Sequence, residues 1–511
     1  MVRAVLLSLF LVADGATLHA EERKLTVEDA VALAIAHNGE LYVAQADTEV
    51  AADEVAIAGS IFDPHLVLNA RYGREDQLGN AVRLGWTDSL ATGSLELRGL
   101  TGLGSTYSIG VFANYDRYRS PLTTVFDPAY TTSVNLTLTQ PLLRGAGGSA
   151  IHAPIVVASL RRELSEQQLR VKLEITVGQV EVAYWNLALA HNEVAAREAL
   201  LKVAKEQVNE STRLVKIGTI SDLDVVEAQS GVNREQQALL LARQQVVDAE
   251  GQLRALIIGD PSWKGDDTLV PSDDPTAAPT KISAKEHLEL ARKNRPDLRA
   301  ARSQVSFESA GLAITKNDRK PQLDLILSAG VIGFAGTPDE ESGVVGTDGF
   351  IGDPDAVGGL GTSLRNLGAG NYAVTLGLRL DLPLTNRAAK ARHERQLHAV
   401  GRAKVAERAV IAQLENEIYT TVALIDSNAA LQMSADEAVK TDERLLAGMR
   451  KRFTAGTVSS YDVLRVADDL TRARINAARA RVSYRISLAR LAIADGTLLG
   501  KYNITTTSLT K

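Results

Sequence analysis

A long seven-residue apolar repeat constrains the fold of this chain more than any other feature. Large apolar residues recur at Leu173, Val180, Leu187, Val194, Leu201, Val208 and Val215, and then at Val225, Val232, Leu239, Val246 and Leu253. A strict seven-residue repeat makes a left-handed coiled coil, and alanines three residues after several of these positions let helices approach closely. One helix from about residue 155 to residue 215 would be about 90 Å long at 1.5 Å per residue. The repeat therefore predicts an elongated helical hairpin.

The chain contains this pattern twice. Residues 25–30 resemble residues 282–287, and residues 218–225 resemble residues 456–463. The second heptad series consists of Ile411, Ile418, Ile425, Gln432, Val439, Leu446 and Phe453, followed by Val463, Leu470, Ala477, Tyr484 and Leu491. The spacing between matching residues falls from 257 to 238 along the chain, so the first half carries a longer insertion. Insertions of that kind belong in loops.

Each half has signals for the beginning and end of its helices. Thr26 and Ser283 are suited to N-cap the first short helix of each half. A Gly-Thr pair, beginning at Gly218 or Gly456, turns each hairpin, because glycine permits the backbone that a tight turn needs. A shorter helix then descends and ends near residues 258–261 in the first half and 494–496 in the second.

Apolar and polar residues alternate with a period of two between the proline landmarks of each half. The apolar members include Leu66, Leu68, Ile109, Val111, Val134, Leu136, Leu138, Leu323, Leu325, Leu327, Val374, Leu376, Leu378 and Leu380. This pattern is typical of a barrel with lipid outside and water inside, although strands of a soluble sandwich carry the same local pattern. Residues 333–371 are rich in glycine and aspartate without any period, which predicts a long extracellular loop.

The N-terminus has the layout of a secretory signal peptide. Arg3 precedes an apolar run at residues 4–13 and a small-residue region, with cleavage expected after Gly15 or Ala20. No later segment offers about 18 consecutive apolar residues, so strands are the only expected route into a membrane. The chain has no cysteine for a disulfide framework. A net charge of -6 without a basic patch argues against nucleic-acid binding.

These patterns divide the chain into two repeats joined by a linker. The expected segments are a signal peptide (1–20), a first short helix (21–62), first barrel strands with an extracellular loop (63–142), a first long hairpin (143–260), a linker (261–281), a second short helix (282–320), second barrel strands with the Gly/Asp-rich loop (321–384), a second long hairpin (385–496) and a C-terminal tail (497–511).

The chain resembles the TolC-like outer-membrane efflux proteins over nearly all of its mature length. The resemblance rests on the duplicated halves, on residues 140–145 (Gln-Pro-Leu-Leu-Arg-Gly) and on the twice-used tip pattern Gly-Thr-x-Ser-x-x-Asp-Val. It implies a mostly α protein with membrane β structure. Three chains would each give four strands to a 12-stranded barrel, continuous with a periplasmic coiled-coil barrel, because a barrel shared between chains leaves no open edge in lipid.

The same resemblance implies a passive exit duct in the outer membrane, with a large periplasmic portion. Such a homotrimer exports drugs, other toxic compounds, metals or proteins, including by type I secretion, and it contacts outer-membrane lipid. Its partners are a periplasmic adaptor (membrane fusion) protein and an inner-membrane transporter. The resemblance implies no enzymatic activity, no cofactor and no metal.

Eight residues are implied by the resemblance to form the hairpin tips, where the tunnel opens and the adaptor binds. They are Gly218, Thr219, Ser221, Asp224, Gly456, Thr457, Ser459 and Asp462. Each also has a purely structural explanation. The glycines permit the turn, and the serines and aspartates cap the descending helices, where an oxygen and a negative charge are favoured. The two roles can coexist.

Asp462 matches a position at which family members narrow the tunnel with acidic side chains. Three residues later, where a second acid would strengthen such a ring, this chain has Arg465. A doubly acidic periplasmic constriction is therefore not expected. Asp462 and Arg465 could pair between copies, or within one helix at the i, i+3 spacing.

Two other classes of function compete with the duct. Catalysis has no support, because the eight histidines are scattered and no H-E-x-x-H, Walker or G-x-S-x-G motif is present. A periplasmic coiled-coil adaptor is the alternative, although one hairpin between compact β domains would be expected of it. Trp86 is a candidate for an interfacial aromatic residue, whereas Trp185 is expected to pack between helices. The cargo stays open.

Overall fold

The computed structural model describes residues 22–74, 86–119, 125–257, 268–339, 353–455 and 457–504. The expected signal peptide at residues 1–20 and the tip residue Gly456 lie outside these ranges. The chain divides into two compact units. One comprises Met1–Thr48, Ser165–Ala300 and Arg408–Lys511, and the other comprises Glu49–Leu164 and Ala301–Glu407. Helices α2, α3, α6 and α8 contribute residues to both units.

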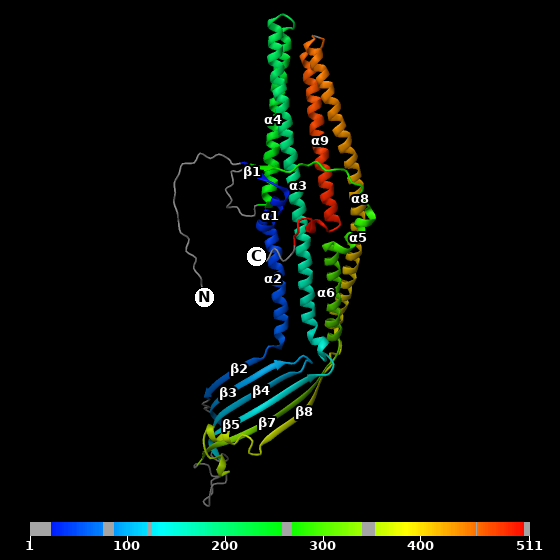
Figure 1. Ribbon diagram of the computed structural model, residues 1–511. Coiled ribbons are helices and arrows are strands. Elements are labelled where there is room, and N and C mark those ends of the chain that lie inside the picture. The colour runs from blue at the N-terminus through cyan, green and yellow to red at the C-terminus, as the bar shows by residue number, and fades with distance from the viewer. Residues whose placement is uncertain are drawn as a thin grey trace, which may run out of the picture. The chain divides into compact units, whose positions relative to one another are not determined.

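Both halves of the chain use the same order of helices (Figure 1). The first half contains α1 (Val27–His37), α2 (Gly39–Gly59), α3 (Gly148–Lys216) and α4 (Asp222–Ile257). The second half contains α5 (Ala284–Asn294), α6 (Pro296–Asp318), α8 (Arg387–Thr454), α9 (Ser460–Ala494) and the short α10 (Leu498–Lys501). The predicted hairpins of one long and one shorter helix are confirmed. None of the described helices has both the length and the apolar character needed to cross a membrane.

The heptad positions form the packed side of the hairpins, as the repeat predicts. Leu173, Val180 and Leu187 of α3 are fully buried, and so are Ile418 and Ile425 of α8. The polar exception in the second series, Gln432, is also buried, and its side-chain amide donates to the carbonyl of Ala277 at 3.3 Å. This bond offsets part of the cost of burying the amide, whose Oε1 has no partner among the described residues.

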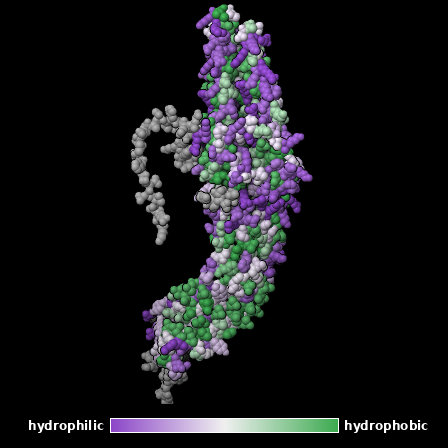
Figure 2. Space-filling model, in the orientation of Figure 1, coloured by the Kyte–Doolittle hydropathy of each residue, from purple (hydrophilic) through white to green (hydrophobic). Residues whose placement is uncertain are grey.

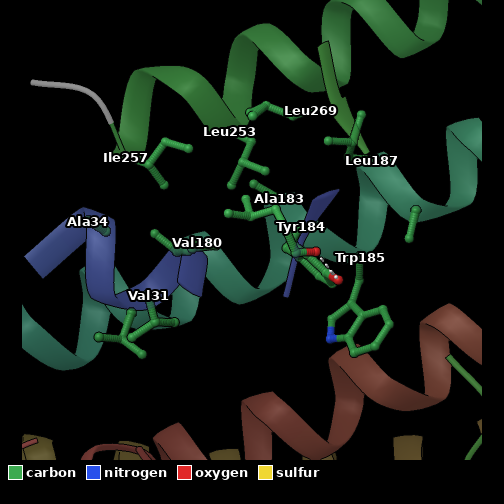
Figure 3. Close-up of a cluster of buried hydrophobic side chains, with 14 of the residues drawn as sticks. Val31, Ala34, Val180, Ala183, Tyr184, Trp185, Leu187, Leu253, Ile257 and Leu269 are labelled. Carbon is green, nitrogen blue, oxygen red and sulfur yellow. Dashed lines mark hydrogen bonds between the residues drawn. The ribbon is translucent and has the colours of Figure 1, made fainter. Parts of the chain in front are cut away.

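The first hydrophobic core lies where α1, α3 and α4 meet, and Figure 3 shows these side chains converging. Tyr184 anchors it through a hydroxyl that lies 2.8 Å from the carboxylate of Asp273 and 3.0 Å from the carbonyl of Leu25, two acceptors that share its one proton. Trp185 is almost fully buried and stands edge-on to Tyr184, with 5.2 Å between ring centroids. The expectation that Trp185 packs between helices is therefore confirmed.

The second core repeats this arrangement with α5, α8 and α9. Its buried members are Leu288, Ala291, Leu298, Leu414, Ile418, Val422, Ile425, Tyr484, Leu491 and Ala494. The linker between the halves first forms β6 (Thr268–Pro271), which pairs in parallel with β1 (Glu22–Leu25). Farther on, Thr280 donates its N–H to the hydroxyl of Tyr484 at 3.1 Å. A buried tyrosine in each half therefore holds one end of the linker.

The second unit contains a six-stranded antiparallel sheet in the order β2-β3-β4-β5-β7-β8 (Figure 1). Its strands are β2 (His65–Arg74), β3 (Trp86–Leu100), β4 (Thr106–Arg119), β5 (Phe126–Pro141), β7 (Gln322–Pro338) and β8 (Tyr372–Asp381). The expectation of four strands per chain is wrong for this chain. The longer insertion of the first half is built into the sheet as additional strands, so that half supplies four of the six.

The segment expected to be a structureless loop, residues 333–371, also needs correction. Strand β7 continues to Pro338, and a 3-10 turn (Pro354–Ala356) and α7 (Leu360–Arg365) follow the undescribed residues 340–352. Ser363 of α7 donates its hydroxyl to the carbonyl of Gly333 at 2.9 Å. The end of β7 extends beyond β8, so its backbone groups find partners in this segment instead.

Candidate functional site: the sheet faces and the hairpin tips

The register of the sheet places apolar side chains from all six strands on one face. One row across the strands is Leu68, Leu95, Val111, Val134, Val331 and Tyr372, and the next is Leu66, Leu97, Ile109, Leu136, Ala329 and Val374. A row on the opposite face is His65, Arg98, Ser108, Thr137, Ser328 and Thr375. The predicted alternation is therefore confirmed and holds in register across the whole sheet.

Burial on this sheet is the reverse of that in a soluble protein. Leu136 on a central strand is 46% exposed and Leu68 is 77% exposed, whereas Glu96 is only 7% exposed and Asp324 only 4%. Figure 2 shows hydrophobic residues gathered over these strands. An exposed apolar surface of this extent marks an interaction site, and in a sheet with a polar reverse side it matches the lipid-facing band of a membrane barrel. A soluble sandwich would bury this face instead.

Three charged groups of the polar face, Arg98, Glu96 and Asp324, have partners on the same face. The guanidinium of Arg98 donates to one carboxylate oxygen of Glu96 from Nε at 2.8 Å and from Nη2 at 2.6 Å. The amide of Gln322 donates to the carboxylate of Asp324 at 2.7 Å. The opposite face of the same strands is apolar. The sheet therefore has one polar and one apolar face.

The first hairpin tip is a glycine turn followed by an acidic helix start. Gly218 has φ +79°, in the left-handed region, and its N–H donates to the carbonyl of Val215 at 2.9 Å. The N–H of Thr219 donates to the carbonyl of Leu214 at 2.9 Å, which closes the end of α3. The Asp224 carboxylate accepts from both the N–H and the hydroxyl of Ser221, each at 2.9 Å. Gly218, Thr219 and Ser221 are exposed, so the turn and any docked partner can share them.

The second tip has the same plan with a complete capping box. Thr457 donates its N–H to the carbonyl of Arg452 at 3.0 Å, at the position equivalent to Thr219. Ser459 caps α9 by accepting from the N–H of Asp462 at 3.2 Å, and the Asp462 carboxylate accepts from the Ser459 hydroxyl at 2.8 Å. Two hydrogen bonds from Ser459 hold the pKa of Asp462 below its usual value. The bond from the Ser459 hydroxyl has the larger effect, and the bond from its backbone N–H has the smaller one.

The structural role foreseen for the tip serines is thus present, but the pairing of Asp462 with Arg465 is not. Among the described residues no ion pair joins these two side chains. The charge of Arg465 still contributes to lowering the pKa of Asp462, after the two bonds to Ser459. Arg465 is exposed.

A charged cluster between the hairpins was missed by the sequence analysis. Arg197 of α3 lies 3.4 Å from Glu235 of α4 and 3.8 Å from Asp468 of α9, and Asp468 also pairs with Arg472 at 2.5 Å. These residues border a cavity of about 280 Å³ together with Tyr461 and others. Burial, and then the charge of Asp468, raise the pKa of Glu235. Its residues lie between the apolar heptad positions. At such positions the sequence alone does not distinguish a charged side chain exposed to solvent from one packed between helices.

The described residues contain no group of three or more His, Cys, Asp or Glu side chains placed to hold a metal ion. The sequence matches the model of a family described as Outer membrane efflux protein over residues 106–258 and 287–497, which is more than half of the chain. The chain belongs to the outer membrane efflux protein family.

Solved structures with the same fold agree with this membership. The Campylobacter jejuni CmeC outer membrane channel is 16% identical, with a TM-score of 0.63, and the match covers 92% of this chain and 86% of that one. The outer membrane protein VceC of Vibrio cholerae is 16% identical, with a TM-score of 0.61 and coverage of 92% and 96%. The Neisseria gonorrhoeae MtrE outer membrane channel is 15% identical, with a TM-score of 0.61 and coverage of 93% and 89%. No curated protein matches the sequence.

The residues that match the family model cover only part of the sheet. The matched residues contain β4, β5, β7 and β8. Strands β2 and β3 precede the first matched range. The two strands at one side of the sheet are therefore the part of it that the family match leaves out.

Proposed function

We propose that this efflux family protein is one subunit of a three-chain exit duct in the outer membrane, with its helical hairpins in the periplasm. The duct is passive and catalyses nothing. It takes small toxic compounds, metals or proteins from an inner-membrane transporter through a periplasmic adaptor. The tunnel opens at the hairpin tips, around Gly218 and Thr457 and their neighbours.

The observation that carries this proposal is the single apolar face that runs through all six strands of the sheet. In a bilayer every backbone polar group needs a partner within the protein, so a spanning sheet has to close into a barrel. The described sheet does not close on itself, because β2 and β8 each pair on one side only. Further copies of the chain are the simplest source of the missing partners.

The helices support assembly from several copies as well. Helix α4 exposes Val226, Leu240 and Val247, and α8 exposes Leu424, Leu431 and Leu445. Within each set the residues are separated by multiples of seven. Apolar residues at heptad spacing form the seam of a coiled coil. A second, unused seam on each hairpin is what a subunit of a helical tube needs in order to bind its neighbours.

The first test is where the protein is found and in what form. Membranes of the expressing cell are fractionated, the protein is extracted with detergent, and single particles are imaged. A threefold hollow tube from the outer-membrane fraction is expected. Compact monomers or rods in the soluble periplasmic fraction would contradict the duct and favour the adaptor alternative.

The second test addresses the tips. Thr219→Arg and Thr457→Arg replace exposed side chains that lie beyond the ends of α3 and α8 with a bulky cation. Export is expected to fall while the trimer and its outer-membrane location stay unchanged, because only adaptor docking is disturbed. Gln237→Arg, an exposed substitution on α4 away from the tip, is the matched control. Normal export by both tip variants would remove the tips from the adaptor contact.

A further inference from the structure

The two edges of the sheet, β2 and β8, are matched in length and direction. Each has ten residues, and a strand of a membrane barrel needs about 9–11 to cross the bilayer. Neighbouring strands are antiparallel throughout the order β2-β3-β4-β5-β7-β8, so β2 and β8 run in opposite directions. The β8 strand of one copy can therefore pair with the β2 strand of the next in the antiparallel sense used by the rest of the sheet.

The side chains on these edges are as suited to lipid as those inside the sheet. Strand β2 carries Leu66, Leu68 and Tyr72 on its apolar face, and β8 carries Tyr372, Val374, Leu376, Leu378 and Leu380. The register places both sets on the same face as the central residues Val111 and Leu136. A joint between β8 and β2 would continue the apolar face without a break.

Strands β2 and β3 are integral to the sheet and are not an appendage. Strand β3 pairs with β4 from Trp86 to Leu100, with one irregularity near its start, and β2 pairs with β3 over its whole length. These ladders occupy the side of β4 that a four-stranded subunit would leave free for the next copy. A copy that joined at β4 would have to displace β3.

We propose that β2 and β8 are the joints between copies, so that three copies of this chain close a barrel of 18 strands, six from each. This proposal rests on the three-chain duct proposed above. Barrel diameter grows roughly linearly with strand number, so the lumen is about 1.5 times as wide as that of a 12-stranded barrel, and barrels of about 16–18 strands hold an aqueous channel. The polar face, with Arg98, Ser108 and Thr375, lines it.

Cysteine cross-linking tests the joint cleanly, because the chain has no cysteine of its own. Thr375→Cys on the polar face of β8 is combined in turn with Val67→Cys, Asn69→Cys and Arg71→Cys on the same face of β2, which scans the register of the joint. Thr375→Cys with Ser108→Cys or Asn114→Cys on β4 tests the four-stranded alternative. Thr375→Cys with Ser328→Cys, directly opposite within one chain, is the control for a folded sheet.

Oxidation of outer-membrane trimers is expected to give covalent dimers and trimers with at least one β2–β8 pair and only monomers with the β4 and Ser328 pairs. Intermolecular cross-links through β4 would overturn the six-strand subunit and leave the three-chain duct intact. Outer-membrane trimers without any intermolecular cross-link would also overturn the joint. Recovery of the cysteine-free protein as a soluble monomer would overturn both the joint and the duct. Imaging of the barrel in lipid gives an independent count, with 18 strands expected and 12 contradicting the proposal.

Discussion

The two halves of the chain share their helical hairpins but differ in the sheet. In both halves a long helix and a shorter helix form a hairpin and pack around a core closed by a buried tyrosine, Tyr184 or Tyr484. In the sheet, the first half supplies four strands and the second only two. The longer insertion of the first half supplies its two additional strands, β2 and β3.

This difference teaches that the two kinds of structure tolerate insertion differently. A coiled coil fixes its length by a strict seven-residue repeat, so an insertion of arbitrary length would break the seam. An antiparallel sheet accepts a whole added hairpin at the cost of two more ladders and no change in the existing register. The four predictions below test how far the halves are equivalent, from the largest expected effect to the smallest.

Leu253 and Leu491 occupy equivalent positions in the two cores and are both buried. Truncation to alanine at either position is expected to destabilise its half by about 2–5 kcal/mol, because each leaves a cavity among helices. Thermal unfolding of the detergent-extracted protein measures the effect, with the exposed Gln237→Ala as control. A loss at one position only would break the equivalence of the cores.

Glu174 should make the first half sensitive to pH, because the matching residue of the second half is Ala412. Burial raises the pKa of Glu174 to about 8, and Arg295 partly opposes this. Below pH about 4.5, the ordinary pKa of a glutamate, the carboxyl is protonated in both the folded and the unfolded protein. As the pH rises from there to about 8, only the unfolded protein loses the proton readily, so the folded state becomes less stable.

The unmodified protein should therefore lose stability on the order of a few kcal/mol between pH 5 and pH 9, and Glu174→Gln should remove most of that slope. Unfolding midpoints across this range, measured for both proteins, test the assignment. Equal slopes would show that the carboxyl of Glu174 does not titrate with a raised pKa.

Gly218→Ala should destabilise the first tip by about 1–2 kcal/mol, because its φ of +79° is a conformation that L side chains adopt at a cost. Space is not the obstacle, since no atom lies within 4 Å of the added Cβ. Hydrogen exchange of the Thr219 N–H reports opening of this turn. Unchanged protection would contradict a strained turn at Gly218.

Ser459→Ala should cost about 1 kcal/mol through loss of the N-cap. Ser221→Ala should cost less, because the Ser459 hydroxyl accepts from the Asp462 N–H, whereas the Ser221 hydroxyl only donates to Asp224. Hydrogen exchange in the first turns of α9 and α4 compares them. A larger effect at Ser221 would reverse the expected order of the two tips.

Much of this fold could be predicted from the sequence because it follows local periodicity. The heptads predicted the long hairpins, the alternation predicted the sheet faces, and the Gly-Thr pattern located both turns. The strand number could not be predicted, because strands with an alternating pattern look alike whether or not they pair with each other. The cluster of Arg197, Glu235 and Asp468 was missed for a similar reason, since its members come from three helices.

The sequence by itself determined the helical architecture and the chemistry of each strand face, since these depend on residues a few positions apart. Only the tertiary structure decided that the insertion pairs as β2 and β3, that Arg197, Glu235 and Asp468 come together, and that the described sheet ends at β2 and β8. Such features depend on which distant backbone and side-chain groups meet, and hydrogen bonds between them form only after the chain has brought them together.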